Sequence, residues 1–174
     1  MKRIITLTVN NQAGVLNRIT GLFMKRQYNI ESITVGHAEK PGISRMTFVV
    51  NVDDQNKLEQ VIKQLNKQID VLKVTDITDQ AIVARELALI KVIISAPQNR
   101  NEITSLIEPF RASIIDVSQN SMTVQVTGDS DKVDALIELL RPYGIKELAR
   151  TGVTAFTRGT QRQESEIRHF SIIN

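Results

Sequence analysis

The stretch with the clearest chemical potential is Asn10–Leu16, a turn between a β-branched apolar segment and a segment whose apolar residues recur at helical spacing. The first amides of a helix have no acceptor within the helix, and the helix dipole adds partial positive charge there. The amides of Gly14, Val15 and Leu16 can therefore hold a small anion such as a carboxylate. Gly14 has no Cβ, so it accepts a positive φ and lets a ligand approach the backbone. The alternative is an ordinary connecting turn in which Asn11 approximates a helix cap.

Residue types that support catalysis or metal binding are missing or scattered. The chain has no cysteine, which excludes a disulfide scaffold, a thiolate zinc site and a cysteine nucleophile. Its two histidines, His37 and His169, are too far apart in sequence for the spacing of a metal site. No glycine loop of the phosphate-binding type is present, and the carboxylates fall at capping or solvent positions. We expect no catalytic residue and no metal site.

Charge and hydropathy narrow the range of partners. The net charge is +3 and the pI is near 9.3, but basic residues alternate with acidic ones instead of forming a stripe. Aromatic residues make up 4% of the chain without any tryptophan, which argues against base stacking. Apolar runs such as 87–95, interrupted by Lys91, are too short to span a bilayer, and the N-terminus begins with a strand instead of a signal peptide. We expect a cytoplasmic protein that binds neither nucleic acid nor a membrane.

The pattern of the first half predicts the order βαββαβ. A Pro-Gly pair at Pro41 indicates a hairpin turn, and an apolar stripe at i, i+3, i+4 and i+7 follows an aspartate cap. The predicted strands are 3–9, 30–36, 44–52 and 69–75, and the predicted helices begin at Val15 and after Asp53 or Asp54.

The second half repeats this order, which predicts an α+β protein of two ferredoxin-like βαββαβ domains in tandem. The turn at 96–101, equivalent to the one before Val15, has no glycine, so only the first half carries the anion-binding turn. We expect strands at 87–95, 112–118, 122–127 and 145–156, with helices marked by Ile103 to Phe110 and Val133 to Leu140. The predicted divisions are a first domain at 1–77, a linker at 78–86, a second domain at 87–156 and a mobile tail at 157–174.

The fold predicts a site shared between two chains. With the strand order 4-1-3-2, the second strand lies at an edge, and its first residue, Asn29, lies at the opposite end from Gly14. An unpaired apolar edge at 30–35 invites pairing, and a two-fold axis there would bring Asn29 of one chain beside Gly14 of the other. The pocket would suit a small apolar amino acid. Its polar parts would be Asn11, Asn29 and the helix amides, and its walls Val15, Leu16 and Ile30. The alternative is that Asn29 only ends the helix and that the edge is protected otherwise.

Several segments carry a resemblance to a known family. The residues 11–16 and 28–35, together with Phe23, resemble the ACT domain, an amino-acid-sensing module. With the segments 85–92 and 147–152, the chain resembles the small, regulatory subunits of acetolactate synthase. The resemblance extends to about Gly159.

This resemblance implies a non-catalytic subunit that activates a thiamine-diphosphate-dependent catalytic subunit and confers feedback inhibition by valine, or sometimes by other branched-chain amino acids. Thiamine diphosphate, Mg and FAD would belong to the catalytic partner. By the family's pattern, the effector contacts fall on Asn11, Gly14, Val15, Leu16, Asn29 and Ile30. A free-standing sensor or transcriptional regulator is an alternative, although no helix-turn-helix segment is recognisable. A small enzyme would need a convergent acid or base, and we find none.

Overall fold

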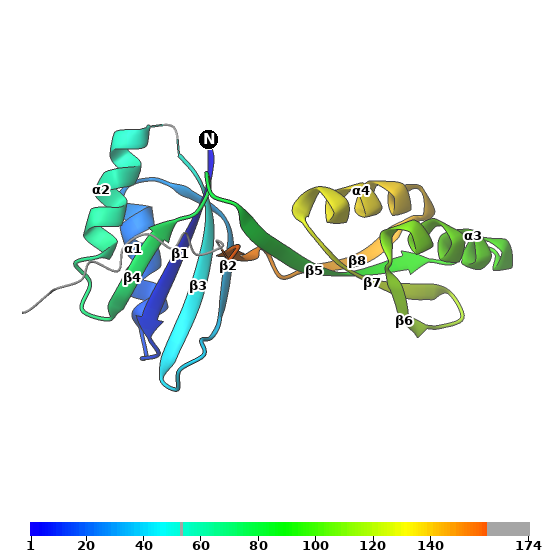
Figure 1. Cartoon of the computed structure of the whole chain (residues 1–174). Helices are drawn as coiled ribbons and strands as arrows, with labels where there is room; N and C mark the ends of the chain where they lie inside the picture. Colours follow the sequence, from blue (N-terminus) through cyan, green and yellow to red (C-terminus); the bar gives the residue numbers. More distant parts are fainter. Residues whose placement is uncertain (53, 160–174) are drawn as a thin grey trace, which may run out of the picture.

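The computed structural model describes residues 1–52 and 54–159 and contains two sheet-and-helix halves (Figure 1). In the first half, the strand order β2-β3-β1-β4 confirms the predicted order 4-1-3-2. The elements are β1 (Lys2–Asn10), α1 (Val15–Lys25), β2 (Asn29–His37), β3 (Ile43–Asn51), α2 (Gln55–Leu65) and β4 (Val71–Asp76). The edge strand β2 contacts only β3 within this sheet, so its outer edge is unpaired in the single chain.

Both helices of the first half bury one apolar stripe against the same face of the sheet. Every fourth residue of α1 from Val15 is buried, and Phe23 stacks on Phe48 of β3 with ring centroids 5.1 Å apart. The apolar stripe of α2 is buried at Leu58, Val61 and Leu65. The Asp54 carboxylate caps the helix by accepting a hydrogen bond from the Asn56 amide. A cap of this kind contributes about 1 kcal/mol. Helix α1 lies on the β2 side and α2 on the β4 side.

The second half repeats the arrangement, with strand order β6-β7-β5-β8 and helices α3 and α4 on one face (Figure 1). Its elements are β5 (Ile82–Ile93), α3 (Pro97–Ile107), η1 (Glu108–Phe110), β6 (Ser113–Val117), β7 (Ser121–Gly128), α4 (Ser130–Leu140), η2 (Arg141–Tyr143), β8 (Ile145–Arg150) and β9 (Thr154–Thr157). The apolar stripe predicted from Val133 to Leu140 is buried. The fold class is therefore confirmed as two βαββαβ units.

Four element boundaries differ from the sequence expectation. The expected linker 78–86 contains the start of β5, because residues 82–85 pair with β9. The expected last strand 145–156 is two strands, β8 and β9, separated by Gly152 at φ +80. Thr157, assigned to the tail, ends β9, and residues 160–174 lie outside the described residues. Ile69, expected to begin the fourth strand, is 91% exposed and precedes β4.

A ribbon formed by β9 and residues 82–85 of β5 packs on the sheet face opposite to α1 and α2. Its inner side joins an apolar cluster made by Val49, Ile77, Val153 and Ala155, with Ile4, Ile82 and Ala84 beside it. The Thr34 hydroxyl donates to the Val153 carbonyl at 2.7 Å, and an Arg45 Nη donates to the Ala155 carbonyl at 3.3 Å. The first sheet is thus covered by helices on one face and partly by the ribbon on the other. Among the described helices, none is both long and apolar enough to cross a membrane.

Candidate functional site

The turn before α1 has the backbone geometry predicted for it. Gly14 adopts φ 82 and ψ −4, a left-handed conformation, and is itself the N-cap of α1 without any side-chain cap bond. The alternative in which Asn11 caps the helix is therefore wrong. The Asn11 amide instead donates to the carbonyl of Gly42, at 2.8 Å, which ties the turn to the β2–β3 hairpin.

The helix amides are only partly free to bind a ligand. The Val15 amide donates to the Gln12 carbonyl at 3.3 Å. In the described part of the chain, the amides of Gly14 and Leu16 donate to no acceptor. The first turn of α1 carries no acidic residue, so the positive end of the helix dipole is not neutralised there.

Arg18 adds a cation to this turn that the sequence reasoning missed. One Arg18 Nη lies 3.4 Å from where a Cβ on Gly14 would stand, and the side chain is half exposed. Arg18 also pairs with Asp70, at the entry to β4. Its position four residues after Gly14, one helical turn away, was the available signal. The turn therefore offers free amides, a helix dipole and a nearby guanidinium, a set of groups suited to a carboxylate.

The predicted wall residues differ in how they are exposed. Leu16 is 41% exposed beside the turn, whereas Val15 is 2% exposed and belongs to the core under α1. A ligand at the turn can reach the side chain of Leu16 and the backbone of Val15. Asn11 is exposed and its side chain is available to a ligand.

The remaining predicted residues, Asn29 and Ile30, begin β2 at the other end of α1. They pair with Asn51 and Val50, while Asn10, just before the turn, pairs with Ile43 at the opposite end of β3. The 11 residues of α1 between the two groups span about 16 Å. In a single chain the two groups of predicted residues are therefore separated, as the strand order predicted.

A hollow of about 320 Å3 lies beside the start of β2. It is lined by Ile30 and Tyr28 together with the outward face of α1, namely Asn17, Thr20, Gly21 and Met24. Met24 is 72% exposed, and a Cβ built on Gly21 meets no atom within 4 Å. Sequence reasoning missed this face, although a glycine inside a helix was a signal that a neighbour approaches closely. The face is continuous with the unpaired edge of β2.

Comparison with known proteins agrees with this architecture. Residues 5–73 match the model described as AHAS small subunit-like ACT domain, and residues 85–159 match the model described as small subunit of acetolactate synthase. The acetolactate synthase small subunit of Bacillus subtilis is 70% identical over 173 residues, which cover 99% of this chain and all of that protein. The chain belongs to the acetolactate synthase small-subunit family.

Other members of the small-subunit family are similar over nearly the same length. The probable acetolactate synthase small subunit of Methanothermobacter thermautotrophicus is 53% identical over 91% of this chain and 94% of its own. The crystal structure of the small subunit from Thermotoga maritima superposes with a TM-score of 0.84 at 39% identity, covering 92% of this chain and 99% of that one. The first half is therefore an ACT domain of this family.

In this small-subunit chain, a second hollow of about 390 Å3 lies where the two halves meet. Glu86 of β5 is buried there and accepts hydrogen bonds from Ser130 and Arg150, and Arg150 also donates to Asp134 at 2.6 Å. Burial raises the pKa of Glu86, but the hydrogen bonds from Arg150 and Ser130 outweigh it and hold the pKa below its ordinary value. All four residues belong to the second half, where Arg150 is shared between two carboxylates, so its charge is already paired and is not free for an anionic ligand.

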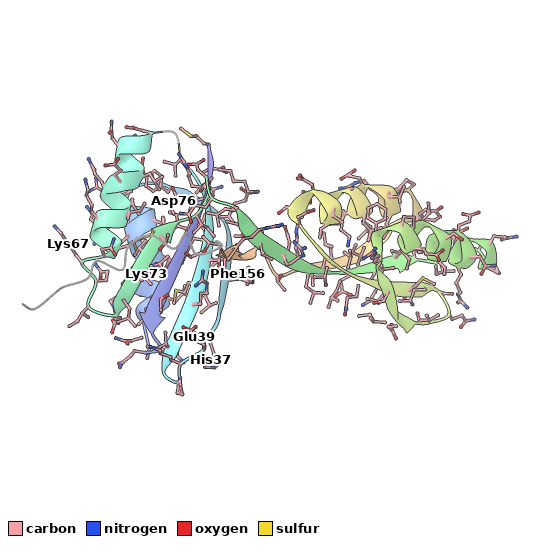
Figure 2. The ribbon with its side chains drawn as sticks, viewed as in Figure 1. His37, Glu39, Lys67, Lys73, Asp76 and Phe156 are labelled. Atoms are coloured by element: carbon pink, nitrogen blue, oxygen red, sulfur yellow. The ribbon has the colours of Figure 1, made fainter. Side chains whose placement is uncertain are left out.

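The described residues contain no group of three His, Cys, Asp or Glu side chains that could hold a metal ion. His37 lies at the hairpin end of β2, near Glu39 (Figure 2). His169 lies outside the described residues.

Proposed function

We propose that this chain is the non-catalytic regulatory subunit of acetolactate synthase, which activates the catalytic subunit and confers feedback inhibition by valine in branched-chain amino acid biosynthesis. The observation that carries this proposal is the left-handed Gly14 turn at the start of α1, in a chain of the small-subunit family. Thiamine diphosphate, Mg and FAD are assigned to the catalytic partner, and this chain supplies the effector site.

The effector site is completed by a second copy of the chain. Two copies pair antiparallel through β2 about a two-fold axis, which places Asn29 and Ile30 of the partner subunit beside Gly14. The outward faces of the two α1 helices then meet, because α1 lies on the β2 side of its sheet. An exposed Met24 and a glycine at position 21 on this face support a close helix contact.

The bound amino acid is oriented by its two charged groups. Its carboxylate accepts from the amides of Gly14 and Leu16, with the Arg18 guanidinium nearby. Its ammonium donates to the side-chain oxygens of Asn11 and of Asn29 of the partner subunit. The branched side chain packs against Leu16 and Ile30 of the partner subunit, and this apolar pair favours valine over a polar amino acid.

Feedback follows from binding that differs between two states of the assembly. Because both protomers contribute to the site, valine favours the arrangement in which the β2 edges are closely paired. The edge strand is linked to the second half through the hydrogen bond from Thr34 to Val153 of the ribbon. A shift of β2 therefore reaches β5 and β9, and the second half passes it to the catalytic subunit.

The test is a Gly14→Asp substitution in the subunit reconstituted with its catalytic partner. The new carboxylate occupies the place of the ligand's carboxylate, so we expect acetolactate formation to be activated but no longer inhibited by valine. The matched control is Gly14→Asn, which has the same size and tolerates a left-handed conformation, without the charge. We expect this control to keep most of the valine inhibition. Unchanged inhibition in Gly14→Asp would falsify the placement of the effector at this turn.

A further inference from the structure

A row of two cations crosses the ribbon-side face of the first sheet. Thr8 of β1 is paired directly with Arg45 of β3 on one side and with Lys73 of β4 on the other. Directly paired residues share a face of the sheet, and neighbouring strands are about 4.8 Å apart. Arg45 and Lys73 therefore flank Thr8 on the same face, with their Cα atoms about 10 Å apart. The next row on this face, two residues along each strand, consists of three threonines: Thr47, Thr6 and Thr75.

A hollow of about 200 Å3 lies above these rows. Besides the cations and threonines, it is bounded by the turn after β4 and by the end of β9. Its lining residues are Thr6, Thr8, Arg45, Lys73, Thr75, Ile77, Gln80 and Thr157, none of them acidic. Figure 2 labels Lys73 on β4 and Phe156 on β9.

Among the described residues, the two cations have no carboxylate partner, unlike Arg3 and Arg18 of the same domain. Arg3 pairs with Asp79, and Arg18 pairs with Asp70. Within residues 1–52 and 54–159, Arg45 and Lys73 pair with no acidic group, and the Arg45 Nε is buried without any acceptor. A buried donor without an acceptor is destabilising, and two unpaired cations on one face of a sheet repel each other. An anion in the hollow would lower the repulsion between the two cations.

We propose that this hollow binds a small oxyanion of the phosphate type. The Arg45 guanidinium and Lys73 ammonium would donate to its oxygens, as would the hydroxyls of Thr8, Thr75 and Thr157. These donors outnumber the two oxygens of a carboxylate, and the volume exceeds the ~30 Å3 share of one water several-fold. The site lies on the opposite sheet face from α1, so it is separate from the turn at Gly14. Because Thr157 belongs to β9, a bound phosphate would also fasten the ribbon to the first sheet.

The experiment is a titration of the full chain with inorganic phosphate at constant ionic strength, followed by amide chemical shifts. We expect saturable shifts at Thr8, Lys73 and Thr157. Lys73→Gln and Arg45→Gln should each weaken binding about tenfold or more, because a charge-assisted hydrogen bond is lost. The matched control is Lys67→Gln, which removes the same charge from the nearby α2–β4 turn (Figure 2) and should leave the affinity unchanged.

Three outcomes would overturn the proposal. These are shifts that do not saturate, shifts that map to the start of α1, and equal weakening by Lys67→Gln and Lys73→Gln. Lys73 is exposed, so its substitution tests the site even where Arg45→Gln loosens the ribbon. A parallel titration with methyl phosphate distinguishes the two possible ligands, which are inorganic phosphate and the phosphate group of a larger metabolite. Tighter binding of the ester assigns the hollow to the phosphate of a larger metabolite, and tighter binding of the free ion assigns it to inorganic phosphate.

Discussion

Gly21 offers the most direct test of the dimer that the effector site requires. A glycine inside a helix costs about 0.5–1 kcal/mol relative to alanine. A Cβ built on Gly21 meets no atom within 4 Å, so packing inside the chain does not require the glycine. The residue lines the hollow beside Ile30 that we assign to the contact between two copies. We expect Gly21→Gln to stabilise the isolated chain and to weaken the dimer.

The effect on the stability of the monomer and the effect on the dimer have opposite signs, and each can be measured separately. Glutamine is a good helix former, so the free energy of unfolding of the monomer should rise by about 0.5–1 kcal/mol. Overpacking a well-packed contact costs about 1–3 kcal/mol, and the two-fold axis introduces the new side chain twice. The cost of about 2 kcal/mol or more corresponds to a dissociation constant raised about 30-fold or more.

Sedimentation equilibrium of the full chain over a concentration series, with and without valine, measures the dissociation constant. Unfolding is measured at protein concentrations below this dissociation constant, because dimerisation itself adds to the apparent stability. Gly21→Ala is the matched control, because alanine also favours the helix but adds only a methyl group to the contact. A dissociation constant for Gly21→Gln equal to that of the unaltered chain would refute the proposed contact.

Two further predictions concern residues that line the hollow where the two halves meet. The lowered pKa of Glu86 means that its ionised form adds stability above its ordinary pKa of 4.5, and that this stability is lost as the pH falls further. Urea unfolding from pH 7 to pH 3 should therefore show a smaller acid loss in Glu86→Gln, and an identical pH slope in both proteins would contradict this. A Cβ on Gly152, at φ +80, would lie 2.8 Å from the Cβ of Ser32. Gly152→Ala should cost about 1–2 kcal/mol in backbone strain alone and enlarge the radius of gyration in X-ray scattering, whereas Gly159→Ala should do neither.

Local patterns in the sequence were sufficient for most of the fold. The α4 stripe from Val133 to Leu140 and the cap at Asp54 each follow from residues within one or two helical turns, and both are present. The start of β5 was missed because its pairing partner, β9, lies about 70 residues away along the chain. The pattern at Arg85 and Glu86 resembles a polar linker, and only the contacts with Arg150 and Ser130 account for a buried glutamate.

The part of the candidate site that depends on one turn could be predicted from the sequence. The parts that depend on which strands pair with each other could not. The left-handed Gly14 follows from glycine before a helix, and it is confirmed. The burial of Val15 follows from the stripe that it begins, yet the same residue was expected to face a ligand. The row of Thr8, Arg45 and Lys73 joins three distant segments, and it becomes visible only when the strand register is known.

Strand β5 also constrains how the length of this chain can change. Its even-numbered residues share one side, where Ile82 and Ala84 contact the first sheet and Ala88 and Ile90 are buried in the second core. Side chains alternate along a strand, so inserting or deleting a single residue between Ala84 and Ala88 would turn one of these pairs toward solvent. A flexible connection would tolerate such a change. Here the number of residues between the two cores is fixed by the structure. It can change by an even number of residues, which keeps both pairs on the same side of the strand, or by an odd number only if one set of contacts is rebuilt.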